Sequence, residues 1–600
     1  MLKIPIIICY DSDENNRFIL YSSNETGIPQ LYLTSTKINS KPRQITNGQD
    51  PVINGYISPK GDKITYLKDK AGDEIFNLFL FVEEAEDKQI TKNPYRTMGI
   101  GWHPNGKEMV RSYFSMRGTG LEIINVETEE SFILKHPTPL LIDIQYSPGG
   151  KWIACTNITN YLSTEVYIIN RDNPSEIITY SLDNETRDAQ PSWSQDGKKL
   201  AFISEVKGKG QVVIQEFQGQ DRIILDLEQD EEVLAIGDGT TFPPRGGNVI
   251  WDPKGDKIFC IINKEGRTTL HGYPINGKME SNLPFPKGFL RLPKISKDGK
   301  NLIALHCSMT SPSGIYLLKL GFESVLSITP RNFSSDMSLL NQPQSKFYKS
   351  FDEKEIHAWY IPSITNKAYN PAVMYVHGGP WSHIKDCWIS GIFMQILSQS
   401  GFCVFAPNFR GSTGYGVDFQ KMNIKDPGGG DLQDLISGAK WLKSQAEIDS
   451  SKLGIMGASY GGFMTLCALT RFPDAFSVGV SLVPVTDWLE LYRVSDGWAK
   501  HACHTLFTGP PRGKLKQLYI ERSPITHILN IKSNIMIMAG KKDSRAAYQP
   551  IEKFIAKLKE MNHPHEVILD ENAGHISALF NWDESIPFFT EIIEFLKKNL

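Results

Sequence analysis

Short apolar runs alternate with glycine-containing turns through the first half of the chain, and this pattern repeats at a regular interval. Each copy has an apolar or aromatic residue, a small residue, a turn that ends in Gly-Lys or Gly-Asp-Lys, and an apolar strand. A period of about 45 residues is typical of the four-stranded blade of a β-propeller. The turn glycines of the clear copies are Gly61, Gly106, Gly150, Gly197, Gly255 and Gly299. With a degenerate copy at residues 13–21, they predict a seven-bladed β-propeller.

One interval, between Gly197 and Gly255, is longer than the others. Its extra residues include Glu231, Glu232 and a stretch rich in glycine and proline at 237–247. Because extra length in a blade usually forms a surface loop, we expect the two glutamates to lie in a solvated acidic loop. The alternative is that they hold the ammonium group of a substrate.

After about residue 340 the rhythm changes, and short apolar strands alternate with segments whose apolar residues recur every three or four positions. This alternation predicts a mostly parallel sheet with helices on both faces. We place the domain change at the polar segment 341–345, so the expected domains are 1–340 and 341–600. The predicted strands are 372–376, 402–406, 453–456, 478–483, 534–538 and 565–569, and the predicted helices are 431–444, 460–471, 548–561 and 583–599.

Composition narrows the classes of partner. The 600 residues carry a formal net charge of −3, so no positive field favours nucleic acid. The first apolar run, residues 4–10, is too short for a membrane span and lacks the features of a signal peptide. Eight scattered cysteines without a CxxC pair predict neither disulfides nor a zinc site. We therefore expect a cytoplasmic protein without metal, cofactor or membrane segment.

Ser459 lies in Gly457-Ala-Ser-Tyr-Gly-Gly462, between a predicted strand that ends at Met456 and a predicted helix that begins near Tyr460. This is the context of a nucleophile elbow, in which glycines relieve crowding at a strained turn and the hydroxyl is exposed above the sheet. A glycine-rich turn that only packs a helix on a strand is the structural alternative. The strand-to-helix context favours Ser459 as a nucleophile.

A serine hydroxyl needs a base to accept its proton and an acid to orient that base, in the order Ser, Asp or Glu, His. His575 follows Gly574 in a loop between the last predicted strand and the terminal helix, which makes it the candidate base. Asp543 follows the penultimate strand and is the candidate acid. Asp487 is the other candidate, although its position favours a helix N-cap.

Two donors must also stabilise the oxyanion of a tetrahedral intermediate. The backbone amide of Tyr460, directly after the nucleophile, is one candidate. The second is expected in the loop that follows strand 372–376, which reads His377-Gly-Gly-Pro380. We choose Gly379, because Pro380 has no amide hydrogen.

Together these motifs resemble those of the prolyl oligopeptidase family of serine peptidases. Their residue sequences are most similar to those of the acylaminoacyl-peptidase branch. The resemblance implies a seven-bladed β-propeller at 1–340 and an α/β-hydrolase domain at 341–600. It also implies a triad of Ser459, Asp543 and His575 and an oxyanion hole formed by Gly379 and Tyr460. The propeller is then expected to restrict the access of folded proteins to the active site. The matching segments, in chain order, are His377–Pro380, Asn408–Gly416, Gly428–Asp434, Gly457–Gly462, Gly540–Arg545 and Gly574–His575.

By the same resemblance, Arg545 binds the carbonyl of the substrate residue that precedes the cleaved one, and a fixed guanidinium suits such an acceptor. An ion pair with a nearby carboxylate is the alternative for Arg545. The chain departs from the family pattern with Ala539 before Gly540 and with Ala546-Ala547 after the arginine, which affects the wall of the binding site. Trp488, Tyr492 and Trp498 either line a specificity pocket or pack in the core.

These features predict a serine peptidase that cleaves short peptides or N-acylated peptides. An esterase for small acyl esters would use the same triad. A dipeptidyl-peptidase would also need an acidic pair for a free amine, for which Glu231 and Glu232 are the candidates. A non-enzymatic reading, with the propeller as an interaction module, is disfavoured by the complete set of catalytic groups. Whether the chain forms a homo-oligomer stays open.

Overall fold

The computed structural model divides into two compact units, one formed by Lys3–Ser308 with Pro312–Ser334 and one by Ser335–Leu600 with Met309–Ser311. The domain boundary expected between residues 340 and 341 stays a proposal. The structure describes residues 3–600 except 38–39, 71–74, 93–94, 116–117, 136–139, 161, 226, 229, 235–246, 276–279, 330–336, 366, 496, 572 and 576–580.

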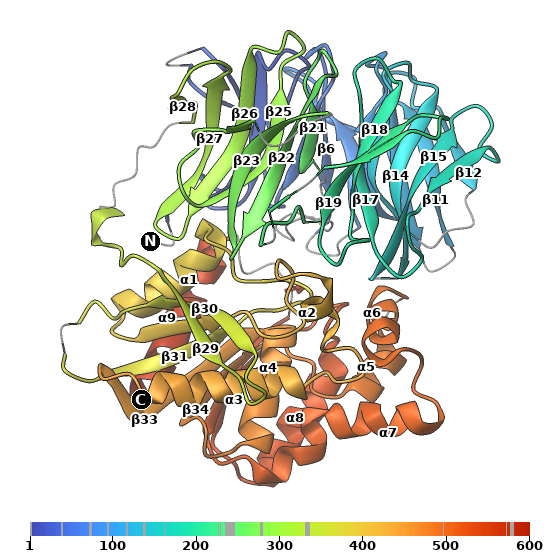
Figure 1. Cartoon of the computed structure of the whole chain (residues 1–600). Helices are drawn as coiled ribbons and strands as arrows, with labels where there is room; N and C mark the ends of the chain where they lie inside the picture. The colour runs from blue at the N-terminus through green and yellow to red at the C-terminus, as the bar shows by residue number, and fades with distance from the viewer. Residues whose placement is uncertain are drawn as a thin grey trace. The chain divides into compact units, whose positions relative to one another are not determined.

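The N-terminal unit is a seven-bladed β-propeller of antiparallel four-stranded sheets, as the repeat predicts (Figure 1). Consecutive strands pair within each blade, and separate apolar clusters fill the spaces between blades. The blades are β1–β4 (Ile7–Ser12, Phe18–Ser23, Gln30–Ser35, Arg43–Gln44), β5–β8 (Asn54–Ile57, Ile64–Lys68, Asn77–Leu80, Lys88–Gln89), β9–β12 (Arg96–Trp102, Glu108–Ser115, Gly118–Asn125, Ser131–Lys135), β13–β16 (Leu141–Tyr146, Trp152–Asn160, Ser163–Asn170, Ile177–Tyr180), β17–β20 (Asp188–Trp193, Lys199–Ser204, Gln211–Glu216, Arg222–Ile224), β21–β24 (Val249–Trp251, Lys257–Lys264, Arg267–Pro274, Ser281–Asn282) and β25–β28 (Phe289–Ile295, Asn301–Ser308, Ser311–Lys319, Val325–Ser327).

The repeated turns join the first and second strands of the blades. All six turn glycines have φ between 69° and 79°, the left-handed region that favours glycine. In the degenerate first copy Asn16 takes this position with φ of 52°, and its amide donates to the Asp13 carbonyl at 2.9 Å. Asparagine tolerates this conformation better than most residues, which explains why the first blade closes without a glycine.

The C-terminal unit is an α/β-hydrolase domain built on an eight-stranded sheet of order β29-β30-β32-β31-β33-β34-β35-β36. The pairs β29–β30 and β30–β32 are antiparallel, and the remaining pairs are parallel. The strands are β29 (Gln344–Lys349), β30 (Glu355–Ile361), β31 (Asn370–Val376), β32 (Cys403–Pro407), β33 (Ile448–Ala458), β34 (Val478–Leu482), β35 (Asn534–Gly540) and β36 (His565–Asp570). All six predicted strands are confirmed, whereas β29 and β30 were not predicted.

Helices cover both faces of this sheet (Figure 1). One apolar cluster joins α3, α4 and α8 to one face, and a second joins α1 and α9 to the other. The helices are α1 (Trp388–Gln399), α2 (Val417–Lys421), α3 (Gly430–Lys443), α4 (Tyr460–Arg471), α5 (Trp488–Val494), α6 (Gly497–Phe507), α7 (Gly513–Arg522), α8 (Tyr548–Glu560) and α9 (Trp582–Asn599), with 3₁₀ turns at Met337–Leu339 and Pro524–Asn530. Within the described residues, no helix has both the length and the apolar character to cross a membrane.

Candidate active site

Ser459 sits between the end of β33 and the first residue of α4. Its backbone has φ of 58° and ψ of −118°, a conformation that costs a non-glycine residue on the order of 1–3 kcal/mol. Two hydrogen bonds hold it there: the Ser459 amide donates to the Leu482 carbonyl at 2.9 Å, and the Ser459 carbonyl accepts from the Phe463 amide at 2.9 Å. The turn is therefore fixed by β34 on one side and by α4 on the other.

The glycines around Ser459 have no room for a side chain. A β-carbon on Gly457 would lie 2.6 Å from the carbonyl oxygens of Val376 and Gly461, and one on Gly462 would lie 2.7 Å from the carbonyl oxygen of Leu482. A β-carbon on Gly461 would overlap the Val376 carbonyl oxygen. The expectation that glycines relieve crowding at this turn is confirmed.

Asp543 and His575 come from the loops that follow β35 and β36. Asp543 Oδ2 lies 2.6 Å from His575 Nδ1, while Asp543 Oδ1 accepts from the amides of Arg545 and Ala546, both at 2.8 Å. The Asp543 side chain is fully buried and that of His575 is 9% exposed. Because a carboxylate accepts hydrogen bonds and does not donate them, the contact orients His575 with Nδ1 as the donor and leaves Nε2 available as a base.

Ser459, the expected nucleophile, does not contact the Asp543–His575 pair through a hydrogen bond in the part of the chain that the structure describes. Bonds between nucleophile and base are often long in an enzyme without substrate and shorten when the reactive complex forms. The structure thus brings together the candidate acid and base, and it places the candidate nucleophile on an elbow at the same end of the sheet.

The loop after β31 packs against this elbow. A β-carbon on Gly378 would lie 3.5 Å from the β-carbon of Ser459 and 3.0 Å from the Ala458 carbonyl oxygen. Gly379 has φ of 126°, which favours glycine. Tyr460 is the first residue of α4, and such a residue has no intrahelical acceptor for its amide. Both expected oxyanion donors therefore belong to segments that flank Ser459, and the helix N-terminus favours negative charge there.

His377, which precedes the two glycines, was not predicted to have a role. Its ring stacks on Phe409 with centroids 4.2 Å apart, and its Nδ1 and Nε2 lie 2.7 Å from the Gly378 carbonyl oxygen and 2.9 Å from Ser412 Oγ. Burial lowers the pKa of His377 to about 4, so the ring is neutral near pH 7. These contacts fix the start of the glycine loop.

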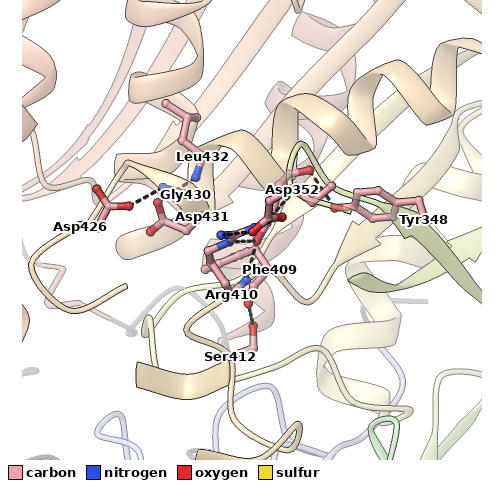
Figure 2. A network of polar contacts seen from close by, with 11 residues as sticks. Tyr348, Asp352, Phe409, Arg410, Ser412, Asp426, Gly430, Asp431 and Leu432 are labelled. Atoms are coloured by element: carbon pink, nitrogen blue, oxygen red, sulfur yellow. Dashed lines mark hydrogen bonds and ion pairs between the residues drawn. The ribbon is translucent and has the colours of Figure 1, made fainter. Parts of the chain in front are cut away.

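Arg410 holds the segment that carries Ser412 (Figure 2). Its guanidinium and amide bond Asp434, which is fully buried on α3, at 2.8–2.9 Å, and its guanidinium also pairs with Asp352 at 2.9 Å. An arginine that satisfies a carboxylate at two positions is a rigid support. The Asn408–Gly416 segment matched a family motif in the sequence, but nothing in it indicated that Arg410 supports the glycine loop through Ser412 and His377.

The remaining candidate residues have different surroundings in the structure. Arg545 is half-buried in the turn that Asp543 caps, next to the proposed acid. Asp487 caps α5, where its side chain accepts from the Glu490 amide at 3.0 Å, so the predicted N-cap is confirmed. Trp488 packs in the core and is 4% exposed, whereas the Tyr492 hydroxyl contacts His504 Nε2 at 2.9 Å. The side chain of Trp498 is outside the described part of the chain.

In the propeller, the expectation of a solvated acidic loop is wrong for Glu232. This residue is 8% exposed and exchanges backbone hydrogen bonds with Asn263. Glu231 is half-buried, and desolvation raises its pKa. The chain returns to the sheet at this point, which explains the burial. Residues 235–246, most of the stretch rich in glycine and proline, lie outside the described residues. No group of three or more His, Cys, Asp or Glu is arranged to hold a metal ion in the described ranges.

A model of the prolyl oligopeptidase family matches residues 389–600, which contain the elbow, Asp543 and His575. This part of the C-terminal unit is thus similar to the prolyl oligopeptidase family. The resemblance to this family that the motifs predict is confirmed for these residues. The match begins within α1, after the loop that carries Gly379.

Two curated relatives are each similar to about a third of the chain. Dipeptidyl aminopeptidase BIII of Pseudoxanthomonas mexicana is 35% identical over 208 residues, which are 34% of this chain and 30% of that protein. Acylamino-acid-releasing enzyme of Mus musculus is 26% identical over 215 residues, which are 35% of this chain and 29% of that protein. The chain thus matches less than a third of the length of either relative.

A solved structure extends the likeness to the whole chain. The puromycin-hydrolyzing peptidase of Mycobacterium tuberculosis superposes with a TM-score of 0.87 at 16% identity, covering 100% of this chain and 95% of that one. At this identity the likeness concerns the fold. It supports the seven-bladed propeller followed by an α/β-hydrolase domain.

Proposed function

We propose that the protein is a serine peptidase that hydrolyses short peptides or N-acylated peptides through an acyl-enzyme intermediate. The observation that carries this proposal is the 2.6 Å contact between His575 Nδ1 and an Asp543 carboxylate that two backbone amides fix in place. A base oriented in this way, at the end of the sheet that also carries an elbow serine, supports the activation of that hydroxyl for acyl transfer.

In the proposed reaction, Nε2 of His575 takes the proton of Ser459 Oγ as that oxygen attacks the substrate carbonyl. The amides of Gly379 and Tyr460 stabilise the resulting oxyanion. The tetrahedral intermediate then collapses, the C–N bond breaks, and His575 gives its proton to the leaving amine. Water, deprotonated by His575, hydrolyses the ester on Ser459 and restores the free enzyme.

The first test removes the nucleophile. We expect Ser459→Ala to lower kcat on a chromogenic acyl-amino-acid substrate by about 10⁶, the loss found when subtilisin loses its nucleophile. Ser451→Ala is the matched control, because this serine is exposed on the same strand and its hydroxyl donates to Asp449. Labelling by a fluorophosphonate should disappear in the first variant and persist in the second. Turnover within tenfold of wild type in Ser459→Ala would exclude this nucleophile.

A second test separates a peptidase from an esterase. We propose that Arg545 binds a carbonyl that peptides and acyl-amino acids have and simple alkyl esters lack. Loss of a charged donor costs about 1.5–3 kcal/mol, so Arg545→Ala should lower kcat/KM for peptides and acyl-amino acids about 10- to 150-fold. The kcat/KM for p-nitrophenyl esters should stay nearly unchanged. Arg493→Ala is the control, since that side chain is 71% exposed. Equal losses on both substrates would instead indicate structural support of the acid loop.

The nature of the substrate N-terminus is the remaining choice. The two curated relatives carry names that point in opposite directions, one to free dipeptidyl ends and one to acylated ends. We propose N-acylated peptides or short peptides as substrates, on the motif resemblance. A dipeptidyl-peptidase would use Glu231 and Glu232 to bind the amine. Rates on acetylated and free-amine substrates of the same sequence distinguish the two, and a strong preference for the free amine would favour the dipeptidyl alternative.

The family resemblance also leads us to propose that the propeller restricts substrate size. Hydrolysis of a short peptide and of the same sequence within a folded protein can be compared directly. Equal rates on both would contradict a restricting propeller.

A further inference from the structure

Tyr460 combines two roles in one residue, because its amide is a proposed oxyanion donor and its side chain is deeply buried. The ring is 2% exposed and packs against Phe463 at 5.0 Å between centroids and Trp488 at 6.3 Å. Its hydroxyl donates to Asp431 Oδ2 at 2.5 Å. This bond connects the residue after the nucleophile to the first turn of α3.

Asp431 is a carboxylate with no exposed surface. Besides the tyrosine hydroxyl, Oδ2 accepts from the Gly428 amide at 3.2 Å and Oδ1 accepts from the Leu432 amide at 2.8 Å (the Leu432 contact is drawn in Figure 2). Burial raises its pKa to about 7, and the nearby carboxylate of Asp426 adds to the shift. No ion pair involves Asp431 among the residues that the structure describes. Burial of a carboxyl group in the core is unfavourable unless hydrogen bonds compensate the loss of water, as these three donors do.

Asp434, three residues further along α3, provides a comparison. It is also fully buried, but Arg410 compensates its charge through several hydrogen bonds. Its support of the segment that carries Arg410 therefore accounts for the burial of Asp434. The shortest of the Asp431 hydrogen bonds described above is instead made to a side chain on α4, which indicates that its role concerns the position of Tyr460.

We propose that Asp431 is a positioning residue for the oxyanion hole: it holds the Tyr460 side chain so that the amide of Tyr460 keeps its aim at the oxyanion. The proposal rests on the proposed function, since it assumes that this amide acts as a donor. Because the ring and the amide belong to the first residue of α4, a rotation of the unanchored side chain is transmitted to the helix start. The inference concerns the rate of the chemical step rather than substrate binding.

The test compares Asp431→Asn, Tyr460→Phe and the double variant on one chromogenic acyl-amino-acid substrate. Removal of an oxyanion donor costs 10²–10³ in kcat, so loss of its support should cost less, about 10-fold in kcat, with KM within about twofold of wild type. In Asp431→Asn one side-chain oxygen becomes an NH2 group and can no longer accept. If the two residues act through one hydrogen bond, the double variant should be no slower than the slower single variant.

Tyr348→Phe is the matched control. Tyr348 is also a buried tyrosine, 3% exposed, whose hydroxyl donates to the Asp434 carbonyl at 2.9 Å (labelled in Figure 2), but it lies on β29. It should lose similar stability, measured by thermal melting, and keep its kcat. All rates are expressed per active site titrated with a fluorophosphonate, which corrects for misfolded protein. If Asp431→Asn fails to fold, Tyr460→Phe carries the test by itself.

The outcomes separate the inference from the function on which it rests. A wild-type protein that does not hydrolyse the substrate contradicts the proposed function and, with it, this inference. An active wild type with Tyr460→Phe at an unchanged kcat, a loss confined to KM, or losses that multiply in the double variant would contradict the inference alone. A similar drop of kcat in Tyr348→Phe would show that any buried tyrosine gives the effect, which also overturns it.

Discussion

Replacement of Asp543 by asparagine is the most informative single perturbation, because the structure dictates how the amide must orient. Oδ1 accepts from two backbone amides at 2.8 Å, and only an oxygen can do so. The side-chain oxygen of the introduced asparagine must therefore stay there, which places the NH2 group opposite His575 Nδ1. This group donates to Nδ1, the ring proton moves to Nε2, and the imidazole can no longer accept the proton of Ser459.

The expected magnitude follows from this wrong tautomer. The same substitution of the acid in a chymotrypsin-type triad costs about 10⁴ in kcat, or about 5.5 kcal/mol of transition-state stabilisation. We expect a loss of this order for Asp543→Asn, with an unchanged melting temperature, because the two backbone hydrogen bonds survive. The assay is kcat on a chromogenic acyl-amino-acid substrate under saturating conditions.

Asp487→Asn is the matched control. Asp487 caps α5 through one hydrogen bond from the Glu490 amide, and asparagine is about as good an N-cap as aspartate. This variant should retain both its stability and its kcat. If Asp543→Asn kept its rate within tenfold of wild type, or if Asp487→Asn lost more, the assignment of the acid and the tautomer argument would both be refuted.

Two further predictions concern stability. His377 binds a proton below about pH 6.5 when unfolded but only below about pH 4 when folded, so its contribution to stability is present above pH 6.5 and is lost as the pH falls towards 4. Between pH 6.5 and pH 4 the wild-type protein should therefore lose on the order of 3 kcal/mol of its free energy of unfolding through His377, and His377→Gln should not lose this part. Equal pH dependence of the two proteins would contradict this prediction. Gly461→Ala should destabilise the domain by at least about 1–3 kcal/mol, because the new β-carbon would overlap the Val376 carbonyl oxygen. Gly149 has open space around it, so Gly149→Ala should change the free energy of unfolding by less than about 0.5 kcal/mol. Chemical denaturation of both variants checks this, and equal effects would mean that the elbow adapts.

The fold could be predicted where its signal is local. Each blade turn needs a residue in the left-handed region, which is glycine in six blades and Asn16 in the first, so the repeat appears in the sequence. The unpredicted elements lack such signals. In β29 only Tyr348 is buried, and in α7 only Tyr519, so neither has a strong apolar period. Helix α1 is buried around most of its surface, and its N-cap residue, Cys387, makes no side-chain capping bond.

The candidate site shows the same division. The candidate nucleophile, acid and base stand in short motifs whose order along the chain predicts their roles. Their supports join distant segments: His377 contacts Ser412, and Tyr460 contacts Asp431. The sequence contains all these residues, but it does not show which side chains meet. Glu232 is a similar case, since its charge indicated exposure while its backbone pairing with Asn263 places it inside.

The conformation of Ser459 explains why so many segments converge on one residue. A strained backbone persists only when its surroundings hold it in place, and a single serine cannot do so through its own side chain. Here β34 accepts from its amide through Leu482, the first turn of α4 donates to its carbonyl through Phe463, and the β31 carbonyl of Val376 leaves space only for glycine at Gly461. Each contact uses the backbone rather than a side chain, so the hydroxyl stays free for chemistry. The same logic applies to Asp543, whose Oδ1 is committed to backbone amides while Oδ2 is left for His575.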